Sequence, residues 1–290
     1  MTSICATGAG AIVLGDGEPS CDPTPFLRVR KSRKYMGLQD DLAVVATGRA
    51  LASAGLGTSF GDRAERAGLF LAVGYIPFRE EDILPVLEAS TERDAFDVKR
   101  FGAGGFQRAH PLLTFRCLPN MPAYHVSVSF DVQGPYCVSY PGPAQLYAAL
   151  EEACAAIAEG RVDVALVGGV AAQSNFLVRH HFARIDAPVS PGRLRDAAGM
   201  IVLESEAHAR ARGATVRAKL ESLHVEYMPH DVLREGRPSR ETVDGAAFGD
   251  ELGPARLCVA LAESFERGGT MKHVLDSRDG VLAESLWVLA

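Results

Sequence analysis

Several features that mark membrane, secreted or nucleic-acid-binding proteins are missing from this 290-residue sequence. No apolar run approaches the ~20 residues that cross a bilayer. The first residues, MTSICATGAGAIVLG, carry no basic segment and are interrupted by Gly8 and Gly10, which makes them a poor signal peptide. The net charge is −6, and nothing supplies the basic face that duplex nucleic acid requires. We therefore expect a cytoplasmic protein with neither a membrane nor a nucleic acid as its partner.

Motifs for metals and disulfides are also absent. No two of the six cysteines form a CxxC pair, so reduced thiols are expected. The eight histidines show no HxxxH or HExxH spacing, and the adjacent His180 and His181 point apart on any regular element. We expect no metal and no cofactor. The cysteines are Cys5, Cys21, Cys117, Cys137, Cys154 and Cys258.

Two short matches to catalytic or cofactor motifs are weak. Gly57 to Gly61 fit GxSxG, but a predicted helix precedes Ser59, whereas a serine hydrolase elbow needs a strand there. Gly8-Ala-Gly10 follows the start of an apolar strand, but Val13 stands where a dinucleotide-binding turn needs its third glycine. Neither motif predicts a function.

Apolar strands alternate with helices along most of the chain, which predicts an α/β fold with a mostly parallel sheet covered by helices on both faces. The composition, 47% hydrophobic and 23% charged, suits one large domain or two small ones. The expected strands include residues 4–13, 69–75, 125–130, 136–139, 163–167, 200–203 and 216–223, and the expected helices include 40–54, 80–89, 145–158, 207–212 and 254–267. Residues 90–109 show no clear period.

Four segments together resemble the β-ketoacyl synthases of the thiolase superfamily. They are SICATGAGAI (3–12), HPLLTFRCLPNMPAYHVSVSFDVQGP (110–135), GRVDVALVGGVAA (160–172) and AAGMIVLESEAHARARGATVRAKL (197–220). The resemblance implies a thiolase-like fold. Residues 1–223 would form a domain like the N-terminal half of a ketosynthase, and residues 224–290 a much shortened second half packed against it.

The sequence departs from that family at its catalytic positions. The family's nucleophilic cysteine lies nine residues after the glycine of a Gly-Pro pair, at a turn from strand into helix. Counting from Gly134 gives Pro143, and allowing one deletion gives Gly142. Asp250 stands where one catalytic histidine would be, and neither the second histidine nor the catalytic lysine segment has a counterpart. The resemblance therefore implies no catalytic residue for condensation.

Some ketosynthases pair with an inactive homologue, the chain-length factor, which lines the acyl tunnel of its partner. Short chains of this type resemble subunits of aryl-polyene-type pathways. This resemblance implies a heterodimer with an active ketosynthase, which would bring the acyl carrier protein. The interface would be a strand over 126–139, and a segment near residue 112 would face the acyl pocket. The interface residues would be Val126, Val128, Phe130, Tyr136 and Val138, and the pocket residues Leu112, Leu113, Phe115 and Met121.

Two other functions stay open from the sequence. One is an acyltransferase or other acyl-handling enzyme on the same scaffold, using Cys137 or a His/Asp pair. The other is a stand-alone module that binds a carrier protein or a lipid through the basic run from Arg28 to Lys34. An acyl adduct on the chain would favour the first, and loss of carrier binding on charge reversal of the basic run would favour the second.

Overall fold

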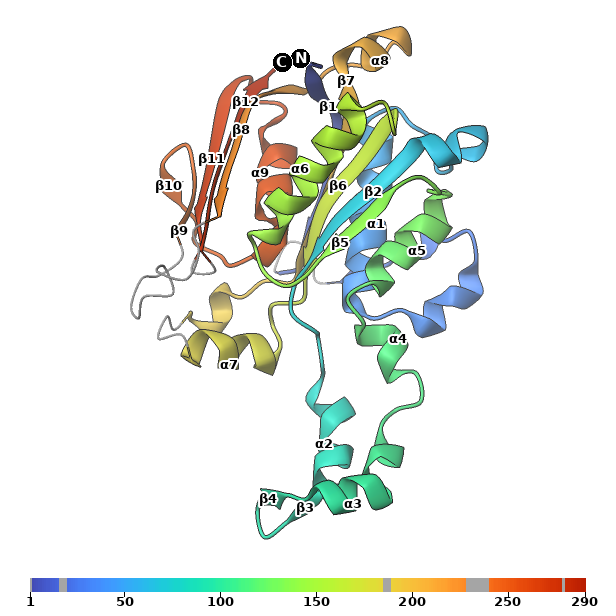
Figure 1. The fold of residues 1–290 in the computed structure, drawn as a ribbon, viewed down its shortest axis with the longest axis vertical. Coiled ribbons are helices and arrows are strands. Elements are labelled where there is room, and N and C mark those ends of the chain that lie inside the picture. The colour runs from blue at the N-terminus through green and yellow to red at the C-terminus, as the bar shows by residue number, and fades with distance from the viewer. Residues whose placement is uncertain (1, 16–19, 185–188, 228–239, 278–279) are drawn as a thin grey trace.

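The computed structural model describes residues 2–15, 20–184, 189–227, 240–277 and 280–290. Its strands and helices form layers, which Figure 1 shows edge-on. Ten of the described strands make one sheet, in the order β10-β9-β11-β12-β8-β1-β7-β6-β2-β5. These strands are β1 (Ile4–Val13), β2 (Ala67–Val73), β5 (Tyr136–Ser139), β6 (Val164–Ala171), β7 (Ala197–Ser205), β8 (Ala218–Tyr227), β9 (Arg240–Val243), β10 (Ala246–Ala247), β11 (Gly269–Asp276) and β12 (Val281–Leu289).

The sheet has two parts that differ in strand direction. β2 is parallel to both β5 and β6, and β6 and β1 are each antiparallel to β7. Hence β1, β2, β5 and β6 run the same way, as the sequence predicts for a mostly parallel sheet. From β8 to β10 the remaining pairs are antiparallel. β8 runs through residue 223, so the division into two domains at that residue stays a prediction.

Helices cover both faces of the mostly parallel part (Figure 1). α1 (Leu38–Ser53) and α5 (Met121–Phe130) lie on one face, and α6 (Gln145–Ala158) and α9 (Arg256–Ser264) on the other. Glycines let these layers come close: a Cβ at Gly10 would lie 2.4 Å from the Ala46 oxygen of α1, and one at Gly169 would lie 2.0 Å from the Pro254 oxygen before α9. The other helices are α2 (Glu80–Ala89), α3 (Val98–Ala103), α4 (Leu113–Cys117), α7 (Phe176–Arg184) and α8 (Glu206–Ala211).

The antiparallel part packs on the far side of α6 and α9, so the order of layers is helix, sheet, helix, sheet. A single apolar core joins α6 and α9 to both sheet parts and includes Tyr147, Leu257 and Trp287. A second core lies between α1, α5 and the other face of the first sheet part. Among the described residues, no helix is long and apolar enough to span a membrane.

The predicted strand over 125–130 is wrong, because these residues belong to helix α5. The alternating HVSVSF also places buried residues four apart, at His125 and Ser129 and at Val126 and Phe130, which is the spacing of one helix face. Pro122 in the first turn suits a helix start. The alternation of polar and apolar residues over 125–130 therefore does not indicate a strand, because these residues pack against α1 as a helix.

An arm that contains α2 and α3 extends away from the layers (Figure 1). Residues 74–79 lead into it and residues 109–112 lead out. It also contains the pair β3 (Thr91–Glu92) and β4 (Ala95–Phe96), which follows α2. Aromatic contacts stabilise it: the Phe101 ring is tilted against Phe96, with centroids 5.8 Å apart, and edge-on to Phe106, with centroids 6.2 Å apart. The arm therefore has a small aromatic cluster in place of a deep core.

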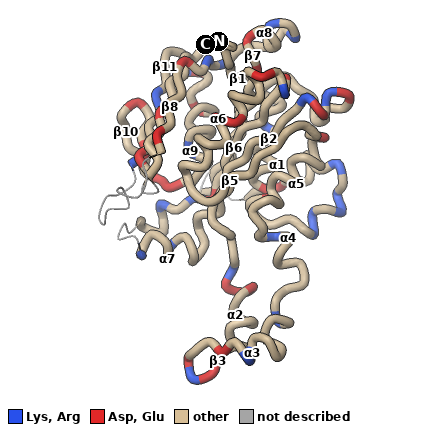
Figure 2. The backbone as a smooth tube through the Cα atoms, in the orientation of Figure 1, with Lys and Arg blue, Asp and Glu red and all other residues tan. Residues whose placement is uncertain are grey.

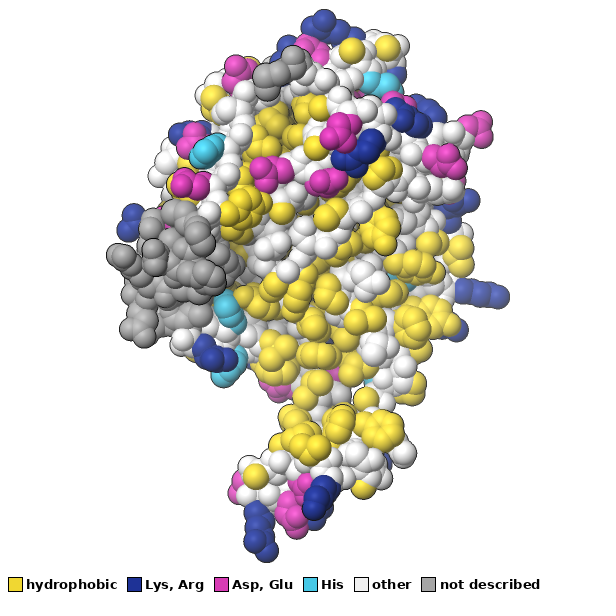
Figure 3. Space-filling view, viewed as in Figure 1, with side chains coloured by type: hydrophobic (Ala, Val, Ile, Leu, Met, Phe, Trp, Pro, Cys, Tyr) yellow, Lys and Arg dark blue, Asp and Glu magenta, His cyan; other side chains and the backbone are white. Residues whose placement is uncertain are grey.

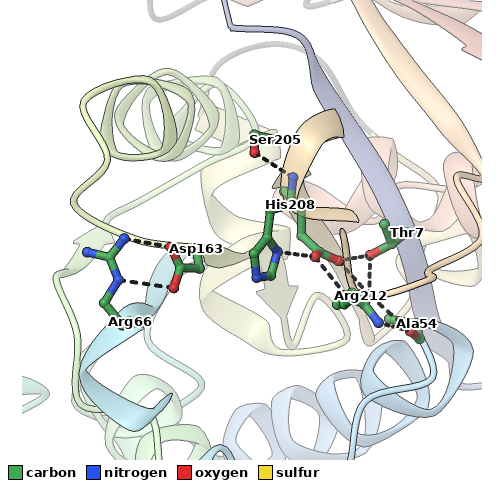
Figure 4. A network of polar contacts seen from close by, with 8 residues as sticks. Thr7, Ala54, Arg66, Asp163, Ser205, His208 and Arg212 are labelled. Carbon is green, nitrogen blue, oxygen red and sulfur yellow. Dashed lines mark hydrogen bonds and ion pairs between the residues drawn. The ribbon is translucent and has the colours of Figure 1, made fainter. Parts of the chain in front are cut away.

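A buried ion pair ties the N-terminal strand to the end of β7 (Figure 4). Glu204 accepts two hydrogen bonds from Arg212, at 2.6 and 2.8 Å, one from Thr7 at 2.5 Å, and pairs with His208 at 2.6 Å. Arg212 also donates to the Ala54 carbonyl at the end of α1. Burial alone would raise the pKa of the Glu204 carboxyl, but these contacts bring it below its usual value. The network therefore holds β1, α1 and α8 together.

Candidate functional site

The turn that matches the nucleophile position lies between β5 and α6. Tyr140-Pro141 is a cis peptide, and Gly142 has φ +104°, a conformation that favours glycine. Pro143 follows, and α6 begins at Gln145. The chain thus makes a strand-to-helix turn at the place that the resemblance implies, and Gly142 provides the positive φ in this turn. Neither residue has a side-chain nucleophile. Pro141 and Pro143 also lack a backbone N–H, so this turn offers few donors to an acyl oxyanion.

Asp250, at the predicted histidine position, lies on the loop before α9. Its carboxylate is 3.4 Å from the Nε of Arg195. Backbone bonds join the same two segments, since Glu251 N donates to the Arg193 carbonyl at 2.7 Å and Arg195 N to the Glu251 carbonyl at 3.1 Å. The loop leads into the short helix Gly253–Ala255, which packs against β6 and α6. Asp250 therefore takes part in a contact between two loops.

Four of the six thiols are poor nucleophiles. Burial raises the pKa of Cys5 and Cys117 to about 11 and of Cys154 and Cys258 to about 12, so these thiols stay protonated near neutral pH. Cys137 is half-buried in β5, and its Sγ lies 3.9 Å from the Ser139 hydroxyl. The described residues contain no group of three His, Cys, Asp or Glu side chains arranged to hold a metal.

A His/Asp pair does exist, but it is enclosed. His125 of α5 and Asp40 of α1 are both buried, and their Nε2 and Oδ2 atoms lie 3.9 Å apart. Burial lowers the pKa of His125 to about 4 and raises that of Asp40 well above its usual value. His125 is therefore neutral at pH 7. The pair packs between two helices, which does not favour its use on an acyl substrate.

The four predicted pocket residues lie together near the base of the arm. Leu112 and Leu113 are half-buried at the start of α4, and Met121 is buried at the start of α5, which α4 contacts. Phe115 is exposed and its ring centroid lies 5.7 Å from that of Tyr35. Their role at an acyl pocket stays a prediction.

The predicted interface residues separate into two groups. Val126 and Phe130 are 0% exposed and pack in the core of this chain, so their assignment to an interface strand is wrong. Val128 is half-buried on the same helix. Tyr136, which is 73% exposed, and Val138 belong to β5, which ends the sheet and pairs on one side only, with β2. An edge strand with free backbone groups is available to a partner.

Apolar side chains gather on the face that includes this edge (Figure 3). They continue from β5 and α5 over α4 to the arm. Neither α5 nor β5 contains a charged residue, as Figure 2 also shows. Contiguous apolar patches of this kind mark interaction sites. The exposed large apolar residues of β5, α5, α4 and the arm, and of the residues that directly follow α4 and β5, are Leu84, Leu87, Phe96, Val98, Phe101, Phe106, Phe115, Leu118, Tyr124, Tyr136 and Tyr140.

A cleft of about 450 Å³ lies between the base of the arm and the body. Its walls follow the carboxyl ends of β2 and β6, the edge at which open α/β sheets bind ligands. Because β5 is parallel to β2, the turn at Gly142 lies at the same edge. Leu113 is the one predicted pocket residue that lines this cleft.

Sequence reasoning missed the arm and most of the cleft. The cleft takes residues from four separated segments, at about 33–41, 77–82, 113–117 and 172–179, so no linear motif predicts it. The arm aromatics do carry a signal, since Phe96, Phe101 and Phe106 recur every five residues in a polar stretch. That spacing fits neither a helix nor a strand.

The family model named Beta-ketoacyl synthase, N-terminal domain, matches residues 6–209. The chain is 29% identical over 253 residues to "Putative polyketide beta-ketoacyl synthase 1" of Streptomyces halstedii, with 80% of this chain and 57% of that one covered. It is 30% identical over 204 residues to "Nodulation protein E" of Rhizobium meliloti, with 66% and 47% covered. The chain thus spans about half the length of these curated relatives.

Solved ketosynthases share the fold. The ketosynthase structure described as "AntDE:AntF (apo): type II PKS acyl-carrier protein in complex with its ketosynthase bound to the hexaketide" has a TM-score of 0.71 at 14% identity, with all of both chains covered. "The ishigamide ketosynthase/chain length factor" has a TM-score of 0.59 at 21% identity, with 78% of this chain and 64% of that one covered. Given the turn at Gly142, the layered fold and the model match over residues 6–209, the chain belongs to the β-ketoacyl synthase family.

Proposed function

We propose that this chain is a non-catalytic, chain-length-factor-like subunit that forms a heterodimer with an active β-ketoacyl-ACP synthase. The proposal rests on two features that occur together at β5: a free sheet edge and a turn without a nucleophile. This strand ends the sheet and is bordered by the apolar face, and it leads directly into a turn that holds Gly142 and Pro143 in place of a nucleophile. An edge strand beside an apolar face supports pairing, and the absence of a side-chain nucleophile at Gly142 and Pro143 supports a non-catalytic role.

In this proposal, β5 pairs antiparallel with the corresponding strand of the partner, and the arm lies along the partner's surface. Main-chain hydrogen bonds at the sheet edge would supply affinity, and the exposed aromatic side chains would supply the buried anchors of the interface. Leu112 and Leu113 would border the acyl pocket of the pair. The product would be a polyketide, polyene or fatty-acid-type chain, with the acyl carrier protein docking through the partner. A short aryl-polyene-type subunit is the finer form of this proposal.

Co-expression with a full-length β-ketoacyl-ACP synthase that has the catalytic cysteine and both histidines tests the proposal. We expect the chain alone to aggregate and the pair to copurify as a 1:1 complex, because the apolar face is then covered. Intact-mass spectrometry after incubation with an acyl-carrier substrate should place the acyl group on the partner cysteine. A stable monomer of this chain at high concentration, or an acyl adduct on it, would contradict the proposal.

A further inference from the structure

The cleft at the base of the arm is polar, although it lies beside the predicted acyl pocket. Five cationic side chains line it: Arg33, Lys34, Arg79, Arg116 and Arg179. They come from four segments that are distant in sequence and meet only in the folded chain. A cleft of about 450 Å³ is large enough for a small organic ligand.

Carboxylates neutralise some of these cations. Arg33 pairs with Asp41 at 2.8 Å, Arg79 with Glu81 at 3.2 Å, and Arg179 lies 3.9 Å from Glu80. Glu80, Glu81 and Asp82 occupy the first turn of α2, where acidic side chains stabilise the helix. Lys34 and Arg116 have no carboxylate partner among the ion pairs of the described residues. The cleft therefore keeps two cations against the carboxylate of Asp82.

Two buried polar atoms on the cleft wall lack hydrogen-bond partners within the described chain. They are Oδ1 of Asp41, a residue only 6% exposed, and Nε of Arg116. Both residues border Gly37: its carbonyl accepts from Asp41 N at 3.1 Å, and a Cβ on it would lie 2.2 Å from the Arg116 oxygen. One acceptor and one donor are thus left open on the same wall. Buried polar groups of this kind are rare unless something binds them.

The N-terminus of α1 lies at the same wall. This 16-residue helix begins at Leu38, which lines the cleft. Its N-cap residue Gly37 donates its N–H to Asp40 Oδ2 at 2.7 Å, and Asp40 and Asp41 are acidic residues of the first turn. These carboxylates already interact with the helix dipole, so Lys34 and Arg116 supply the positive charge for a ligand.

We propose that this cleft binds an oxyanion, a carboxylate or phosphate group, that carries a hydrogen-bond donor beside its charge. The oxyanion accepts from Arg116 and Lys34, and the neighbouring hydroxyl or amide N–H donates to Oδ1 of Asp41. Both open groups are satisfied by such a ligand, whereas a plain hydrocarbon satisfies neither.

The ligand has two chemical sources. One is the far end of an acyl chain that bears a carboxylate, since Leu113 lines both the cleft and the predicted acyl pocket. This source rests on the proposed function. The other is a free phosphate or phosphate monoester, which needs no partner subunit. The chemistry of the site is the same for both.

Calorimetric titration at low salt distinguishes the sources. The probes are inorganic phosphate, 2-hydroxyhexanoate, which has a hydroxyl beside its carboxylate, and the neutral 2-hydroxyhexanamide. The protein is the chain in the form that purifies, alone or with its partner. We expect Arg116→Gln to weaken binding at least about tenfold, because it removes a charge-assisted contact. Lys34→Gln, on an exposed side chain, serves where Arg116→Gln does not fold, and Arg30→Gln, outside the cleft, should leave binding unchanged.

Each outcome decides something. Binding of phosphate alone supports the oxyanion site and removes the acyl source, and binding of the hydroxy acid supports the acyl source. Three results would overturn the proposal: equal binding of 2-hydroxyhexanamide and 2-hydroxyhexanoate, no binding of either anion at about 10 mM, or an affinity of the Arg116 and Lys34 variants equal to that of the unaltered chain. A heterodimer that binds no anion leaves the proposed function intact, and an anion-binding chain that never pairs refutes only the proposed function.

Discussion

The exposed side chain of Tyr136 provides a quantitative test of the heterodimer. A tyrosine buries roughly 150–250 Å² when it is fully enclosed, and Tyr136 is 73% exposed in the single chain. Full burial at the interface would thus remove at least ~110 Å² from water, worth ~3 kcal/mol at about 25 cal/mol per Å². Tyr136→Ala should weaken the complex by roughly a hundredfold.

Tyr227 gives a matched control for this measurement. It is also an exposed tyrosine on a strand, 59% exposed, but it lies on β8 in the antiparallel part, where its hydroxyl donates to Glu151 at 3.0 Å. Affinity measured by biolayer interferometry with the immobilised partner should fall for Tyr136→Ala and stay unchanged for Tyr227→Ala. Equal affinity of the two variants would refute the assignment of the β5 edge to the interface.

Three further predictions concern the pocket and the stability of the fold. Leu112→Trp or Leu113→Trp should shorten the product made by the pair, measured by mass spectrometry, because a larger ring narrows the acyl pocket; an unchanged product length would remove these residues from it. Glu204→Gln should lower the free energy of unfolding by ~3–5 kcal/mol in urea titrations, because it breaks a buried ion pair, whereas Arg66→Ala, which breaks the exposed pair of Arg66 with Asp163 (Figure 4), should change it by ~1 kcal/mol or less. His125 has a pKa of about 4 in the folded chain, so between pH 4 and about 6.5 it binds fewer protons in the folded than in the unfolded chain. The free energy of unfolding should therefore decrease as the pH is lowered below about 6.5, by ~2 kcal/mol at pH 5. His125→Phe should remove this pH dependence in the same titrations.

The sequence correctly predicted those strands and helices whose pattern of apolar residues and breaks fits only one type of secondary structure. β5 and α6 have the expected bounds, since the Gly-Pro break and the Ala-rich amphipathic run admit no other structure. α5 was missed because His125–Phe130 satisfies both the strand and the helix period, and only contact with α1 selects between them. This error carried Val126 and Phe130 into the predicted interface.

The sequence predicted the part of the candidate site that lies in one continuous segment, and it did not predict the part assembled from separate segments. The turn at Gly142 and Pro143 was located by counting from Gly134, because strand, turn and helix follow one another without a gap. The cleft depends on segments brought together by the parallel strands β2 and β6, and on Arg33, Arg116 and Arg179 meeting across them. Charged residues spread over about 150 positions give no local signal of their meeting.

Under the proposed function, the turn after β5 keeps the strand and the helix in place without a nucleophile. A reactive side chain at the N-terminus of a helix requires a strained backbone and open N–H donors, which are unfavourable unless a function retains them. Here Gly142 adopts the positive φ without a Cβ clash, and the two flanking prolines fix the turn while removing donors. The direction of β5 and the start of α6 are thereby kept, and the proposed heterodimer requires both. A cysteine placed at residue 142 would supply a thiol but neither the donors nor the histidines, so under the proposed function this turn serves pairing and not condensation.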